Sequence, residues 1–256
     1  MLQINDFLFK SIYVDVNERR FWNTDGRDFM ALIKPFLIFL KSLLFFLFDS
    51  LALSNVQSFS NNQLKLILII RQDAIGDFVM WLDTAKEYRK LYPPEKYELV
   101  LIGNALWCGL AKQLPYWDKV IPVNVKQFKS FSRYRWKLLR KIRKLKIETA
   151  IQPTFSREFY HGDSLVRACR ALRKVSSEGD MSNRNWLKKI LSDHWNTELI
   201  PASPDSMTEL ERNAEFFSGF SRSPYFASFP RIKIPEFLIK SELKDQTFYV
   251  LVPGTS

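Results

Sequence analysis

The chain has 256 residues, of which 46% are apolar and 25% are charged. This length allows one large domain or two small ones, and the composition excludes a wholly disordered chain, collagen and a disulfide-held scaffold. Two cysteines and two histidines are too few and too dispersed for a Cys- or His-based metal site. We therefore expect a globular protein from a reducing compartment, with no metal.

The net charge of +11 comes from one segment. Residues 119–146 hold eleven of the 38 Lys and Arg and no acid, and the remaining 27 basic residues balance the 27 acids. Such a local surplus indicates an anionic partner: nucleic acid, a phosphorylated substrate or a membrane surface. The apolar residues of this segment recur at helical spacing: Phe131, Tyr134, Leu138, Ile142 and Leu145.

This spacing predicts a helix with an apolar side and a cationic outer face. Phe131 and Tyr134, which could stack on bases, belong to the apolar side. We therefore expect no nucleic-acid partner, and a membrane surface or a phosphorylated acceptor remains, with a simply solvated face as the alternative.

Residues 1–62 are predicted to form an N-terminal extension. The start of the chain is too long and too acidic for a secretory signal. The apolar stretch 36–53 is long enough to cross a bilayer, but Lys41 and Asp49 interrupt it, each at a cost of roughly 3 kcal/mol near the bilayer centre. A helix lying in the membrane interface avoids this cost; a packed helix and a true span are the alternatives. The polar run 54–62 predicts a linker.

From residue 63 onward, predicted strands alternate with predicted helices. The strands are expected at 65–70, 98–103, 119–123, 149–153 and 248–252, and the helices at 78–92, 105–114, 131–145, 163–172 and 206–219. This alternation predicts an α/β fold: a Rossmann-like parallel sheet with helices on both faces, over residues 63–247. Ligands of such sheets bind at the carboxyl ends of the strands, so we expect a site after Ile70 and after Val252.

The loop after the first strand, 71–77, brings together an arginine, two carboxylates and a glycine. It has neither the dinucleotide-binding glycine pattern nor a P-loop lysine. Asp77 is either a helix N-cap or a base that takes a proton from a substrate hydroxyl. Arg71 and Asp73 are either a solvated pair or a site where Arg71 holds a substrate anion.

A second polar group follows the strand at 149–153. Arg157, Glu158 and Asp163 lie on the same edge of the predicted sheet. Arg157 is either a contact for an acceptor phosphate or carboxylate or an exposed loop arginine. His161 lies nearby, and an ordinary loop histidine is its simplest interpretation.

Six short segments resemble, in order and spacing, segments of one protein family. They are 67–79, 114–122, 150–158, 179–183, 209–215 and 250–256. Together they make residues 64–256 similar to the heptosyltransferase-like glycosyltransferases of family 9.

The resemblance implies the N-terminal half of a GT-B fold, in which this half takes the acceptor and a second Rossmann-like half takes the nucleotide sugar. It implies inverting transfer with Asp77 as the catalytic base, an ADP-linked donor and no metal cofactor. Gly254, Thr255 and Ser256 match a donor phosphate-binding loop. The substrate-binding residues expected on this basis are Arg71, Asp73, Gly76, Arg157, Glu158 and Asp163.

The resemblance also implies a phosphorylated glycolipid acceptor, such as a lipopolysaccharide core, and a cytoplasmic protein bound peripherally to the inner face of the bacterial inner membrane. Residues 248–256 are expected to begin a donor-binding domain, which needs on the order of 100 further residues. We therefore expect a truncated transferase, inactive as this fragment. The alternative is a noncatalytic module that binds a membrane surface or an anionic ligand.

Overall fold

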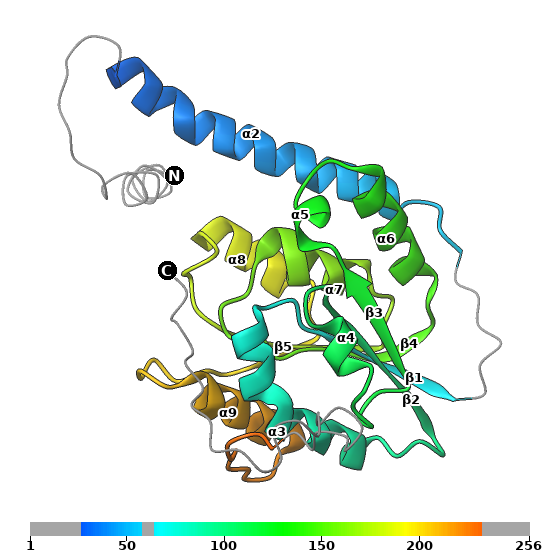
Figure 1. Ribbon diagram of the computed structural model, residues 1–256. Coiled ribbons are helices and arrows are strands. Elements are labelled where there is room, and N and C mark those ends of the chain that lie inside the picture. The colour runs from blue at the N-terminus through cyan, green and yellow to red at the C-terminus, as the bar shows by residue number, and fades with distance from the viewer. Residues whose placement is uncertain (1–26, 58–63, 232–256) are drawn as a thin grey trace, which may run out of the picture.

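The computed structural model describes residues 27–57 and 64–231, with the side chains of residues 36–57 and 64–231. These residues form an α/β domain whose six-stranded sheet is wholly parallel, in the order β3-β2-β1-β4-β5-β6 (Figure 1). The strands are β1 (Lys65–Ile70), β2 (Tyr97–Asn104), β3 (Lys119–Val123), β4 (Ile147–Gln152), β5 (Arg173–Ser177) and β6 (Glu198–Ile200). The helices are α2 (Arg27–Leu53), α3 (Ile75–Leu91), α4 (Cys108–Ala111), α5 (Val125–Phe128), α6 (Arg133–Lys144), α7 (Ser164–Ala168), α8 (Trp186–Asp193) and α9 (Glu209–Ser221), with a π-helical turn, η1 (Phe159–Asp163), before α7.

The predicted α/β fold with a parallel sheet is confirmed. The helix predicted at 105–114 is only α4, Cys108–Ala111, and the larger differences lie on the β5 side. β5 and β6 were not predicted, because one has a single apolar residue in its five and the other has only three residues. The helix predicted at 163–172 ends at Ala168 instead, since the chain must turn back into β5 at Arg173. The strand predicted at 248–252 lies outside the described residues.

Helix α9 begins three residues later than predicted, at Glu209. The capping box is formed by Thr208 and Glu211, whose side chains and backbone amides bond reciprocally. The helix ends at Ser221, two residues beyond the predicted end, and is followed by Arg222 in the left-handed conformation.

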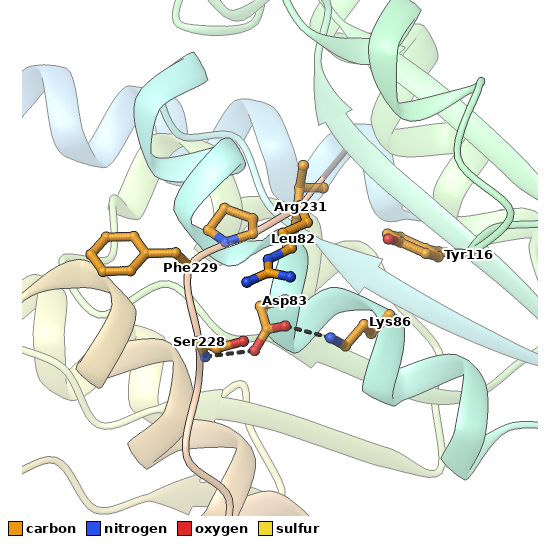
Figure 2. A pocket seen from close by; sticks show the side chains of 8 residues that line it. Leu82, Asp83, Lys86, Tyr116, Ser228, Phe229 and Arg231 are labelled. Atoms are coloured by element: carbon orange, nitrogen blue, oxygen red, sulfur yellow. Dashed lines mark hydrogen bonds and ion pairs between the residues drawn. The ribbon is translucent and has the colours of Figure 1, made fainter. Parts of the chain in front are cut away.

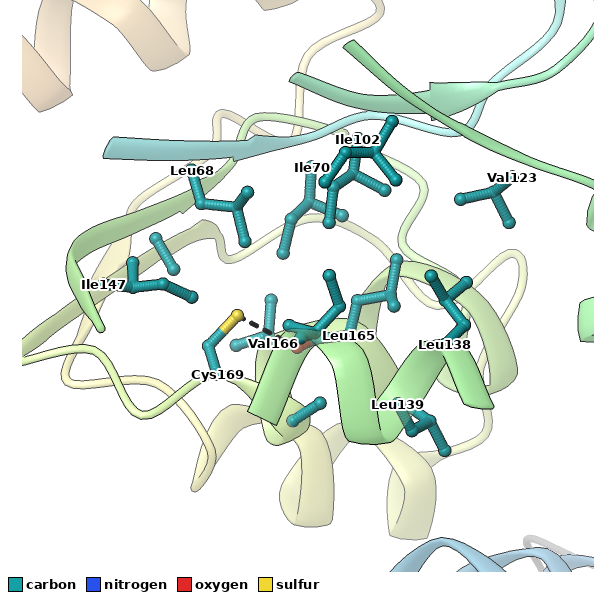
Figure 3. Packing of buried hydrophobic residues seen from close by; sticks show 14 of the residues in the cluster. Leu68, Ile70, Ile102, Val123, Leu138, Leu139, Ile147, Leu165, Val166 and Cys169 are labelled. Carbon is teal, nitrogen blue, oxygen red and sulfur yellow. Dashed lines mark hydrogen bonds between the residues drawn. The ribbon is translucent and has the colours of Figure 1, made fainter. Parts of the chain in front are cut away.

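Alternate residues of the central strands build two hydrophobic cores. Leu68 and Ile70 face α6 and α7, where they meet Leu138 and Leu165 (Figure 3). Ile67 and Ile69 point to the opposite side, toward α3 and α9. All four β1 side chains are fully buried, as period-two alternation in a doubly covered strand requires.

The C-terminal half of α2 is part of the domain and packs across α6 (Figure 1). Arg135 of α6 is fully buried, and its Nε and Nη2 donate to the two carboxylate oxygens of Asp49 at 2.7 and 2.5 Å. Its remaining bonds, each of 2.8 Å, go to the carbonyls of Phe128 and Tyr160 and to the hydroxyl of Ser164. Asp49, which interrupts the apolar stretch in the sequence, therefore has its counter-charge inside the protein.

We predict that Asp49→Ala lowers the free energy of unfolding by about 3–5 kcal/mol, because it leaves the Arg135 guanidinium buried without a counter-charge. Denaturant unfolding followed by circular dichroism measures this. Glu148→Ala is the matched control: it removes the acid of an exposed ion pair with Lys65, so we expect a change below about 1 kcal/mol. Equal small losses would show that α2 does not depend on the buried pair.

Candidate active site

The strand order places a topological switch point beside β1. The chain moves from β1 to β2 on one side, whereas β4 lies on the other side. The loops after β1 (71–74) and after β4 (153–158) therefore diverge at the carboxyl edge of the sheet, where ligands of this architecture bind. Both loops carry the residues that the sequence singled out.

Arg71 is fully buried at the end of β1 and joins this loop to α9. Its Nε lies 2.9 Å from an oxygen of Asp73, and its Nη2 lies 2.5 Å from Oε1 of Glu209. Its Nη1 donates to Oδ1 of Asn213 at 2.7 Å. A guanidinium removed from water needs such partners. Arg71 is therefore no solvated loop residue, and its charge holds carboxylates of the protein itself.

Asp73 lies largely buried between the two loops. The hydroxyl of Thr154, from the loop after β4, donates to its two carboxylate oxygens at 3.3 and 3.4 Å. The indole of Trp107 donates to its backbone carbonyl at 2.9 Å. Burial raises the pKa of Asp73, the charge of Arg71 opposes this rise, and the carboxylate of Asp77 adds to it. Asp73 thus connects the loops across the switch point.

Asp77 is half-buried in the first turn of α3. Among the residues that the structure describes, none forms a hydrogen bond or an ion pair with its carboxylate. The N-cap of α3 is Ala74, so the interpretation of Asp77 as the cap is wrong. A helix start favours negative charge at this position. Asp77 thus offers an unpartnered carboxylate at the ligand edge of the sheet.

Glu209 completes a group of three carboxylates around Arg71. Burial raises the pKa of Glu209; the charge and hydrogen bond of Arg71 lower it, and the nearby Asp73 and Asp77 raise it again. Two of the three, Asp73 and Glu209, bind the guanidinium directly. The third, Asp77, remains available to another molecule.

Arg157 and Asp163 are fully buried and bind each other. Nε of Arg157 donates to Asp163 at 2.8 Å, and its Nη1 donates to Asp193 and to the carbonyl of Ser177, each at 2.9 Å. A second buried guanidinium, that of Arg184, lies 3.4 Å from both aspartates. Arg157 is therefore neither an exposed loop arginine nor a free cation for an acceptor. It fixes the loop after β4.

Glu158 and Gly76 are predicted site residues that solvent reaches: Glu158 is partly exposed and Gly76 is exposed. The hydrogen bond from Nδ1 of His161, at 3.1 Å, lowers the pKa of Glu158 to about 2, and Lys129 lies 3.3 Å away. Gly76 is exposed, and a Cβ there would meet no described atom within 4 Å. The described residues therefore leave the space next to Gly76, in the first turn of α3, open.

Five residues that the sequence pattern does not single out build this edge: Thr154, Arg184, Asp193, Glu209 and Asn213. Glu209 and Asn213 lay inside a segment that carries the family resemblance, which was the available signal. Gly254, Thr255 and Ser256 lie outside the described residues. No group of three His, Cys, Asp or Glu side chains in residues 27–57 and 64–231 could hold a metal ion.

A small pocket lies further along α3, between this helix and the segment that follows α9 (Figure 2). Its polar centre is Asp83, which accepts hydrogen bonds of 2.7 Å from the hydroxyl of Tyr225 and from the amide of Ser228, and a bond from Lys86. Burial alone would raise the pKa of Asp83, but these three bonds outweigh it and lower the pKa to about 2. The segment after α9 is thereby tied to the helix that carries Asp77.

We predict that Arg71→Lys lowers the free energy of unfolding by about 2–4 kcal/mol, although it keeps the charge. One ammonium cannot reach Asp73, Glu209 and Asn213 together as the planar guanidinium does. Arg173→Lys, in a half-exposed pair with Glu198, is the control, with an expected change below about 1 kcal/mol. If thermal or denaturant unfolding gives both variants the same small loss, Arg71 does not hold the loop.

Asp83→Asn tests the attachment of the segment after α9. We predict a loss of about 1.5–3 kcal/mol at pH 7, because three donors lose a charged acceptor. A carboxyl group whose pKa is lowered in the folded state stabilises the fold at pH values above its ordinary pKa of 3.8. This contribution disappears as the pH falls toward 2. The difference in the free energy of unfolding between wild type and variant, measured at several pH values, should therefore become smaller over that pH interval. A gap that stays constant would contradict the assignment.

Comparison with known proteins gives a structural likeness only. No protein-family model matches the sequence, and no curated protein matches it significantly. The crystal structure of a family 9 glycosyl transferase from Veillonella parvula DSM 2008 matches with a TM-score of 0.52 and 14% identity, covering 71% of this chain and 48% of that chain. E. coli heptosyltransferase WaaC with ADP-2-deoxy-2-fluoro heptose matches with a TM-score of 0.49 and 14% identity, covering 66% of this chain and 50% of that one. E. coli ADP-heptose LPS heptosyltransferase II matches with a TM-score of 0.47 and 16% identity, covering 67% of this chain and 47% of that chain.

The chain spans about half the length of these solved structures. At such low identity the likeness concerns the fold alone, and the Veillonella structure carries it. It confirms the Rossmann-like fold and the structural resemblance that the sequence predicted. The described domain is built like part of a family 9 glycosyl transferase.

Proposed function

We propose that this chain forms the acceptor-binding half of a glycosyltransferase that moves a sugar from a nucleotide-sugar donor to a hydroxyl of a cell-envelope glycan. The observation that carries the proposal is the unpartnered carboxylate of Asp77 at the switch point. The likeness of the fold to a family 9 glycosyl transferase supports the same conclusion.

The proposed step is an inverting displacement. Asp77 takes the proton of the acceptor hydroxyl while the oxygen attacks the anomeric carbon from the face opposite the nucleotide. The bond between that carbon and the phosphate oxygen breaks, and the nucleoside diphosphate leaves with the electron pair. A carboxylate in this role must not be neutralised by a neighbouring cation.

The charge of Arg71 does not neutralise Asp77. Its guanidinium binds Asp73 and Glu209, and Asp77 contacts it only through a backbone carbonyl 3.5 Å from Nη2. The cation therefore fixes the start of α3, and the Asp77 carboxylate stays unpaired among residues 27–57 and 64–231. Arg71 and Asp73 act as positioning residues for this base.

The donor and acceptor classes follow from the sequence resemblance. We propose an ADP-linked sugar as the donor, with Gly254, Thr255 and Ser256 as contacts for its phosphates. The proposed acceptor is a phosphorylated glycolipid such as a lipopolysaccharide core, at the cytoplasmic face of the bacterial inner membrane. A carboxylate base and donors for the phosphates supply the chemistry of the step, so the proposal includes no metal.

Asp77→Asn should lower kcat by about 10²–10⁴-fold and leave the KM for the donor little changed, because the amide keeps the shape but cannot take the proton. The assay is the release of ADP from ADP-heptose in the presence of a lipopolysaccharide-core acceptor, with the protein produced from its complete reading frame. Circular dichroism verifies that the variant is folded.

Glu87→Gln is the matched control, since Glu87 is also half-buried on α3 and lies away from the sheet edge. We expect its kcat to stay within about twofold of wild type. Normal turnover by a folded Asp77→Asn variant would remove Asp77 from the role of base.

A further inference from the structure

Helix α2 divides into a docked part and a free part. From Ser42 onward it contacts the domain: Ser42 shares a hydrogen bond of 2.6 Å with the hydroxyl of Tyr160, and the Phe45 ring stacks on Phe131 with centroids 3.8 Å apart. The buried pair of Asp49 and Arg135 lies further along. Residues 42–53 are therefore held by the α/β domain.

The free part exposes apolar side chains on every side of the helix. Five consecutive residues are 37–62% exposed: Phe36, Leu37, Ile38, Phe39 and Leu40. The exposure continues along the outer side of the docked part, through Leu43, Leu44, Leu47 and Leu51. We call these nine residues the apolar face. An apolar patch of this extent in contact with water marks an interaction surface.

A cationic stripe lies beside this apolar face. Besides Arg135, two further α6 residues reach α2: Trp136 packs edge-on against the ring of Phe48, and Arg140 donates to the carbonyl of Ala52 at 3.3 Å. The neighbouring positions on α6 carry three exposed cations at helical spacing: Arg133, Lys137 and Lys141. We call these three the cationic stripe.

The docked part prevents α2 from crossing a bilayer in the state that the structure describes. The stretch Phe36–Leu53 is apolar enough to span, with a mean hydropathy of 2.1. Burying it in lipid would, however, pull Asp49 away from Arg135 and leave both charges unpaired. The part of α2 before Ser42 is about 15 residues, or about 22 Å, long, which is less than the roughly 30 Å of a hydrocarbon core.

We propose that the apolar face of α2 and the cationic stripe of α6 form one surface that binds an anionic lipid bilayer from one side, without crossing it. Apolar side chains enter the headgroup boundary, and the flanking cations meet lipid phosphates. The positive charge favours an anionic bilayer over a second copy of the chain, because the cationic stripes of two copies would repel each other.

This surface is connected to the candidate active site. Tyr160 bonds Ser42 of α2, and it belongs to η1, the turn that follows the site loop after β4. Its carbonyl also accepts from Arg135. The bilayer thus holds the acceptor side of the site in a fixed relation to lipid-linked glycans. The inference rests on the membrane location in the proposed function, but not on sugar transfer.

Vesicle flotation tests the surface directly. We expect the full-length protein to bind vesicles of phosphatidylglycerol and phosphatidylcholine at least about 10-fold more tightly than vesicles of phosphatidylcholine alone, with weaker binding at high salt. The double variant Lys137→Glu/Lys141→Glu should lose most of this preference. Leu40→Glu/Leu44→Glu should reduce binding to both kinds of vesicle.

Lys90→Glu/Lys96→Glu is the matched control. It reverses two exposed charges, one in the last turn of α3 and one in the turn before β2, and we expect its binding to stay within about twofold of wild type. Equal binding to neutral and anionic vesicles, or equal effects of the two lysine pairs, would overturn the role of the cationic stripe. Sugar transfer to a detergent-solubilised acceptor tests the proposed function separately.

Cysteine accessibility tests one-sided binding. The two native cysteines are buried, and Arg27→Cys places a thiol for labelling at the first residue of α2. In cells that express the protein, we expect an impermeant maleimide to label it in inverted inner-membrane vesicles and not in intact spheroplasts. Labelling in spheroplasts would show that α2 crosses the membrane and would overturn the inference.

Discussion

The buried charge of Arg71 is the constraint on which the candidate active site depends. A guanidinium at the end of a central strand, with no access to water, is stable only when acids are brought to it. Asp73 comes from its own loop and Glu209 comes from α9. This requirement joins the first strand to the last helix of the described domain, and it leaves Asp77 as the carboxylate of this group that no described residue binds.

Three more guanidiniums follow the same rule at other points of the domain. Arg135 binds Asp49 and attaches α2 to α6, whereas Arg157 and Arg184 share two aspartates and fix the turn after β4. Each lies close to a loop or helix that borders the site. The basic segment 119–146 therefore contributes in two ways. Its buried Arg135 attaches α2 to the domain, whereas its exposed cations give the surface its positive charge.

Much of the fold could be predicted from local patterns. The apolar run of β1 indicates a strand buried on both faces, and the helical spacing of apolar residues in α6 indicates a helix buried on one side. β5 and β6 lack such a pattern and exist because neighbouring strands offer hydrogen bonds to them. The polar site residues could be located at the correct edge, but not their roles. Two of the three partners of Arg71, Glu209 and Asn213, lie more than 130 residues away in the sequence, so its burial depends on tertiary contacts that no local pattern reveals.

The proposed function requires this domain to position an acceptor hydroxyl for inverting sugar transfer. The most direct measurement follows ADP-heptose and a lipopolysaccharide-core acceptor by NMR, with the protein produced from its complete reading frame. We predict acceptor-dependent release of ADP and a product whose anomeric configuration is opposite to that of the donor. Retained configuration, or hydrolysis of the donor without transfer by folded protein, would contradict the account.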